Sequence, residues 1–227
     1  MPERWRSGER TQCAERSLVS HAARRIGDPV TDAWAALGEE LLLGLVHAAN
    51  NRVTTLSAYA EIAGLEGDSL DPSLLRQEVM RLHKVTTMMG VLATRTSTSE
   101  ALEVRVVLEQ ALALHAQHPR TGMTPCTITA SGLLLPVRVP LFALLRILLL
   151  MVDSAKSVSA ARNAPPAEVH LSGDEGEILI SVSTLAPLAP PATSLARLCG
   201  GVLTCSENVA ELRLPSLLAL RASERQR

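Results

Sequence analysis

Aromatic residues are almost missing from this 227-residue chain. Two tryptophans, one tyrosine and one phenylalanine make up 2% of it, whereas hydrophobic residues as a whole make up 47%. A core must therefore be built from Leu, Val and Ala, which favours helices packed on helices or on a small sheet over an aromatic-rich sandwich. Neither sign of charge is in excess, and the net charge is −1. This balance gives no electrostatic case for nucleic acid or an acidic membrane as a partner.

Cysteine pairs and long apolar runs are also lacking. The four cysteines form no Cys-x-x-Cys motif, and no secretory signal is visible near the start, so we expect a reduced, cytoplasmic setting. The longest apolar stretch, 139–152, contains Arg146 and is too short to cross a bilayer. It predicts a buried helix and no membrane partner. Residues 1–27 are locally basic without apolar periodicity, which predicts a flexible basic arm.

Two long periodic segments fill residues 28–97. Apolar or small residues recur at steps of three and four from Trp34 to Ala63, and again from about Pro72 to Arg95. The stretch "GLEGDSLDPS" at 64–73 separates them with two glycines and an Asp-Pro. Two long helices joined by a short loop predict an antiparallel hairpin. Alone it would expose a broad apolar face, and pairing with a second copy into a four-helix bundle would bury that face. We therefore expect a homodimer.

The pattern changes after the polar stretch "TRTSTSE", and residues 98–220 alternate short strands and helices. This part predicts an α+β sandwich, a small mixed sheet covered on one face by helices. A short tail, 221–227, is expected to follow. The expected elements are a helix at 101–118, two strands around Ser131-Gly132, a buried helix starting at Pro140, a hairpin around the turn at 173–176, a proline-rich loop at 186–194, and a final short helix, Gly-Gly stop and hairpin.

The most informative stretch is "HAANNRVTTLSAYAEIA" at 47–63. At about 100° per residue the apolar stripe centres near Leu45 and Leu56, and His47 lies roughly 150° away, facing water. Its neighbours on that face include short hydrogen-bonding groups three, four and seven residues further on, which suit a surface that another molecule approaches closely. The alternative is an ordinary satisfied histidine. The residues sharing this face are Glu40, Leu43, Asn50, Asn51 and Thr54.

This order of residues resembles the phosphoacceptor segment of bacterial sensor histidine kinases. One large branch of that family has His-acid-Leu-Asn-Asn-Leu-Leu before a similar Gly/Ala-Tyr-Ala-Glu stretch. "ILLLMVDSA" at 147–155 resembles the kinase N-box helix, and "LARLCGGVLTCSENVAELRLP" at 195–215 resembles the closing hairpin of the ATP-binding domain. The resemblance covers residues 31–215. It implies a dimerisation and phosphoacceptor hairpin followed by an ATP-binding-like α/β domain.

The chain departs from the family at the nucleotide site. The asparagine that holds Mg²⁺ in the kinases falls at Met151 and an earlier one at Ile147, and neither side chain suits a hard cation. The Asp-x-Gly-x-Gly expected after "EILISVS" is replaced by "TLAPLAPPATS", and the second glycine-rich segment has no counterpart. We therefore predict a degenerate domain with no ATP binding, no cofactor and no metal of its own. The acid beside the histidine is also lost, to Ala48.

Taken with these departures, the resemblance implies a histidine phosphotransferase. His47 would carry a phosphoryl group between response-regulator aspartates, with Mg²⁺ supplied only by the partner receiver domain. The ridge that docks the receiver would consist of Leu43, Asn50, Asn51 and Thr54. The alternative is a non-catalytic pseudokinase that scaffolds or sequesters a response regulator or a kinase. The departures argue against an ATP-dependent kinase.

A second pair of histidines could suggest a metal site. "HAQH" places His115 and His118 one helical turn apart, as two metal ligands would be. No third ligand is near them in the sequence. We therefore expect a surface pair at the end of a helix.

Overall fold

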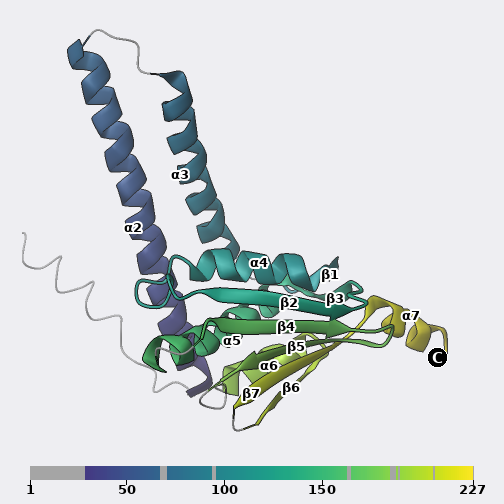
Figure 1. Ribbon diagram of the computed structural model, residues 1–227. Helices are drawn as coiled ribbons and strands as arrows, with labels where there is room; N and C mark the ends of the chain where they lie inside the picture. Colours follow the sequence, from purple (N-terminus) through teal and green to yellow (C-terminus); the bar gives the residue numbers. More distant parts are fainter. Residues whose placement is uncertain are drawn as a thin grey trace, which may run out of the picture.

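The computed structural model describes residues 29–66, 71–93, 96–162, 165–184, 188, 190–206 and 208–226. The basic arm expected at 1–27 lies outside these ranges. The architecture is α+β, as predicted: a long helical hairpin projects from a unit of sheet and helices (Figure 1). Among the described residues, no helix is long and apolar enough to span a bilayer.

The predicted hairpin is confirmed. It consists of α2 (Pro29–Glu66) and α3 (Pro72–Ala93), with the break where the glycines and Asp-Pro predicted it. Pro29 suits a first helical turn because its missing N–H would have no partner there. However, α2 has 38 residues and α3 only 22. Antiparallel pairing therefore covers only the second half of α2, and the first half runs on beside the α/β unit (Figure 1).

That first half of α2 is part of the α/β core. Leu37, Leu41 and Leu45 are buried, and α2 packs against both α5 (Leu141–Arg162) and α6 (Pro190–Leu198). The guanidinium of Arg146 on α5 lies 4.8 Å from the ring centroid of Trp34, a cation–π contact that adds to this packing. The sequence pattern predicts a domain boundary near residue 97. In the structure α2 belongs to both sides of this boundary, because it pairs with α3 and also packs against α5 and α6 of the α/β unit.

The main sheet has five strands in the order β2-β4-β5-β7-β6. Strands β2 and β4 are parallel and the other neighbours are antiparallel, so the sheet is mixed, as expected. Strands β1 and β3 form a separate antiparallel pair. The strands are β1 (Ser99–Leu102), β2 (Cys126–Gly132), β3 (Val137–Pro140), β4 (Ala167–Gly173), β5 (Glu177–Ser183), β6 (Val202–Cys205) and β7 (Val209–Pro215).

One face of the sheet is covered by helices because alternate residues of its strands are apolar. Helices α5 and α6 pack on the strands, and α4 (Val104–His115) packs on α5. The other face carries exposed polar residues such as Glu168 and Arg213. The residues buried beneath the helices are Val169, Leu171, Ile178, Ile180, Val182, Ala210, Leu212 and Leu214.

Five details differ from the expectations. Strand β1 was not predicted, because a Ser-Glu-Ala-Leu segment has little strand preference of its own and pairing with β3 decides its structure. Helix α4 is consequently shorter than 101–118, and the two strands expected around Ser131-Gly132 are separated by residues 133–136.

The proline-rich segment supplies the first turn of α6. The expected tail contains most of α7 (Leu217–Arg225), whose first turn is capped by the hydroxyl of Ser216.

Candidate functional site

His47 lies on the exposed side of α2, as predicted. The side-chain nitrogen of Asn51, one turn further along the helix, lies 3.3 Å from His47 Nε2. Because an amide nitrogen only donates hydrogen bonds, Nε2 accepts this one in the tautomer that carries its ring proton on Nδ1. In that tautomer, once Nε2 is released from Asn51, its lone pair is the group of His47 that can attack an electrophile.

The imidazole borders a hollow of about 510 Å³ between α2 and the turn that follows α4. Of the four residues predicted to dock a receiver, Leu43 and Asn51 line this hollow with His47. Asn50 and Thr54 are exposed on the same helix but do not line it, and the Thr54 hydroxyl donates to the backbone carbonyl of Asn50 at 3.0 Å. The full lining consists of Leu43, Gly44, His47, Ala48, Asn51, Arg52, Ala116, Gln117 and Pro119.

Gly44 allows the two walls of the hollow to meet. A Cβ atom built on Gly44 would lie 1.7 Å from the backbone oxygen of Gln117, so no larger residue fits without moving α2 away from the turn. The contribution of residues 116–119 could not be predicted from the pattern around His47, because these residues are about seventy positions away. The available signal was Gly44 itself, because a glycine in the middle of a helix usually has a packing reason.

A buried carboxylate lies beside the hollow, on the facing helix. Glu78 of α3 is 5% exposed at its side chain and forms ion pairs with Arg52 of α2, at 3.2 Å, and with Arg81 of its own helix. Burial alone would raise the pKa of Glu78. The hydrogen bonds and positive charges of Arg81 and Arg52 outweigh burial, so the pKa lies below its ordinary value and the group is ionised at neutral pH.

Among the described residues that line the hollow, none has an acidic side chain. Ala48, at the position next to His47, is half-buried and contributes only a methyl group. The described lining residues thus offer no carboxylate as a base for the imidazole, whereas Arg52 brings a positive charge to the hollow. An anion is the kind of ligand that these groups suit.

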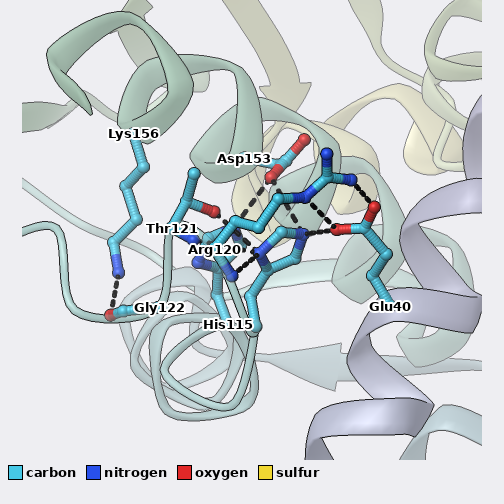
Figure 2. Close-up of polar contacts among 8 residues, drawn as sticks. Glu40, His115, Arg120, Thr121, Gly122, Asp153 and Lys156 are labelled. Atoms are coloured by element: carbon cyan, nitrogen blue, oxygen red, sulfur yellow. Dashed lines mark hydrogen bonds and ion pairs between the residues drawn. The ribbon is translucent and has the colours of Figure 1, made fainter. Parts of the chain in front are cut away.

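A second polar cluster lies two helical turns earlier on α2, and it corrects one expectation. His115 and His118 are not a surface pair: their residues are 0% and 8% exposed, and their rings stack with centroids 5.1 Å apart. They are buried because the turn after α4 folds between α2 and α5. Figure 2 shows Glu40 of α2 and Asp153 of α5 reaching into this cluster.

The hydrogen bonds of the cluster fix its protons. His118 Nδ1 accepts from the backbone N–H of Thr121 at 3.1 Å, so Nε2 carries the proton and donates to Glu40 Oε2 at 2.6 Å. His115 Nε2 lies 3.0 Å from Asp153 Oδ1. Burial is the main cause that lowers the pKa of both histidines. A protonated Nε2 cannot bind a metal, and no group of three or more metal ligands occurs among the residues that the structure describes. The cluster fastens α2 to α5.

The interpretation of Met151 and Ile147 as the positions of metal ligands is not supported. Both side chains are buried, at 1% and 0% exposure, and belong to the hydrophobic core, so neither could reach a ligand at the surface. Asp153, two residues after Met151, instead faces a hollow of about 560 Å³ beside α2. The expectation that the chain does not bind ATP therefore rests on the replaced glycine-rich segments alone and stays a prediction.

No family model matches the chain, and no curated protein matches it. Solved structures with a similar fold include the histidine kinase AdeS of Acinetobacter baumannii, at 12% identity over 75% of this chain and 98% of that one, with a TM-score of 0.43. The cytoplasmic segment of histidine kinase QseC matches at 11% identity over 62% and 93%, with a TM-score of 0.40. The mycobacterial sensor histidine kinase MprB matches at 14% identity over 52% and 97%, with a TM-score of 0.37.

Proposed function

We propose that this chain is a cytoplasmic histidine phosphotransferase of two-component signalling. His47 accepts a phosphoryl group from the aspartate of one response regulator and passes it to another. The observation that carries the proposal is the position of His47, an exposed histidine at the edge of a hollow whose described lining residues include no acidic side chain. The resemblance of residues 47–63 to a phosphoacceptor segment supports the same function.

The chemistry needs little from the chain beyond this nitrogen. The Nε2 lone pair attacks the phosphorus of the aspartyl phosphate, the P–O bond to the carboxylate breaks, and an N–P bond forms. The aspartate leaves as a carboxylate, and the proton on His47 Nδ1 remains there or passes to water. An acyl phosphate is already activated, so the absence of an acid at Ala48 is no obstacle. The receiver supplies Mg²⁺ for its own aspartate.

The partner is a receiver domain, which docks over the hollow. Leu43 is 63% exposed and offers an apolar contact at one edge, and Gln117 and Pro119 form the opposite edge. Asn50 and Thr54 extend the contact along the exposed face of α2. The receiver would therefore touch the helix and the turn together, and it would recognise their relative placement.

The second partner is another copy of the chain. Six large apolar side chains on α3 and the second half of α2 are between 42% and 62% exposed, and apolar surface of this kind often marks a protein–protein interface. The hairpin of a second copy would bury them in a four-helix bundle. These residues are Val53 and Ile62 of α2 and Leu74, Leu75, Val79 and Met80 of α3.

A non-catalytic scaffold is the second candidate. The observation that favours it is the hydrogen bond from Asn51, because His47 Nε2 must give up this bond before it can attack phosphorus. A scaffold would bind a response regulator or a kinase through the same surface and transfer nothing.

Phosphotransfer from a labelled receiver separates the two functions. Receiver domains phosphorylated with labelled acetyl phosphate are incubated with the chain and with His47→Gln. We expect acid-labile, alkali-stable label on the unaltered chain and none on His47→Gln. His83→Gln is the matched control, because His83 is an exposed histidine on α3 outside the hollow. Receiver binding without label on any variant would establish the scaffold. Calorimetric binding of ATP would refute the expectation that none is bound.

A further inference from the structure

Arg52 belongs to two environments at once. Its side chain lines the hollow beside His47, Ala48 and Asn51, and its guanidinium forms an ion pair with Glu78 on the facing helix. The arginine side chain is 39% exposed, so it is open to an incoming ligand, whereas the Glu78 side chain is almost fully enclosed.

The charges around Glu78 do not balance. One carboxylate faces two guanidinium groups, from Arg52 and Arg81, and this leaves one positive charge in excess. A buried carboxylate that loses its only partner is strongly destabilised. If Arg52 moves away, Glu78 is not left unpaired, because its ion pair with Arg81 remains. Arg52 is therefore the member of the trio that can change partners.

A phosphoryl group on His47 would be a suitable new partner. It carries close to two negative charges and several strong acceptor oxygens, and no acidic side chain among the described lining residues would repel it. Arg52 follows His47 by five residues, about 7.5 Å along the helix axis and roughly 140° around it. The two side chains lie near each other because both line the same hollow, and a helical side chain leans back toward the start of its helix, in the direction of His47. Its planar fork can donate two parallel hydrogen bonds to phosphoryl oxygens.

We propose that Arg52 binds the phosphoryl group of phosphorylated His47, exchanging its ion pair with Glu78 for the phosphoryl oxygens. This inference rests on the proposed function in that it requires His47 to carry phosphate, whatever the donor. The exchange stabilises the phosphorylated form. The arginine charge also opposes protonation of the phosphoimidazole, the form that loses its phosphoryl group most readily, so Arg52 slows hydrolysis.

The test uses phosphoramidate, a small phosphoryl donor that needs no receiver. The full chain is phosphorylated, excess donor is removed, and the loss of phosphohistidine is followed by ³¹P NMR. For Arg52→Gln we expect hydrolysis about tenfold faster than in the unaltered chain, in line with the loss of a charge-assisted hydrogen bond at the lower end of its usual strength. Arg52→Lys retains the charge without the fork and should fall between the two. Glu78→Gln releases Arg52 and should slow hydrolysis.

Arg76→Gln is the matched control, because Arg76 is an exposed arginine of α3 outside the hollow. It should leave the lifetime unchanged. Circular dichroism confirms that each variant is folded. Equal lifetimes for Arg52→Gln and the unaltered chain would overturn the inference and leave the proposed function intact. A different outcome is possible: phosphoramidate phosphorylates the chain, the lifetimes are as expected, and no receiver transfers a phosphoryl group to it. That outcome would support the role of Arg52 and refute the proposed function. Absence of phosphohistidine in the unaltered chain would refute both.

Discussion

Replacing Leu41 by alanine tests whether the first half of α2 belongs to the α/β core. Leu41 is 0% exposed and belongs to the hydrophobic core, and its helix packs against α5 and α6. Truncating such a leucine removes its transfer energy and leaves a cavity, which together cost about 3 kcal/mol. In a chain of this size that loss lowers the melting temperature by roughly 6–12 °C. Urea unfolding followed by circular dichroism, at one fixed protein concentration, measures the free-energy change.

Leu43→Ala is the control. It makes the same chemical change two residues away on the same helix, but Leu43 is exposed and its truncation should alter the free energy of unfolding by less than about 0.5 kcal/mol. If Leu41→Ala cost no more than this control, α2 would not be anchored to the α/β unit. The placement of His47 against the turn at 116–119 would then lose its support.

Three further outcomes follow from the same structure. Gly44→Ala should weaken receiver docking and destabilise the chain by about 1–3 kcal/mol, because the new methyl group would meet the backbone oxygen of Gln117; unchanged docking and stability would contradict the close approach. In the folded chain the pKa values of His115 and His118 lie below 6.5, their ordinary value. As the pH is lowered, the unfolded chain therefore binds protons before the folded chain does. Below about pH 6.5 the free energy of unfolding should decrease by at most 1.4 kcal/mol per pH unit for each histidine. Urea unfolding at pH 7.5 and 5.5 measures this, and a flat profile would refute it. Val79→Asp should convert a dimer to a monomer by light scattering, because Val79 lies in the exposed apolar face of the hairpin; a dimer that persists would place the interface elsewhere.

Periodicity predicted the elements that depend on local sequence. The two long helices, the break between them and the hairpin of β4 and β5 are all confirmed, because apolar spacing and turn residues act over a few positions. The outward orientation of His47 is confirmed for the same reason, since a regular helix fixes the direction of each side chain relative to its neighbours. Strand β1 could not be predicted, because its structure depends on a partner nearly forty residues away.

The histidine pair shows where sequence reasoning stops. His115 and His118 have the spacing and helix-end position of an exposed pair, and nothing adjacent to them predicts burial. They are enclosed because α2 and α5 close over the turn that holds them, and the carboxylates that satisfy them come from Glu40 and Asp153. Met151 shows the same limit, since only the packed core reveals that its side chain points away from any surface site.

The sequence by itself determined that this chain carries an outward-facing histidine beside two asparagines on the first of two long helices, because helical geometry is local. Only the tertiary structure decided what surrounds that histidine. The hollow requires the approach of the turn at 116–119 to Gly44, and the charge beside it requires Arg52 and Glu78 to meet across two helices. These contacts join residues far apart in the chain, and the packing that brings them together is a property of the whole core.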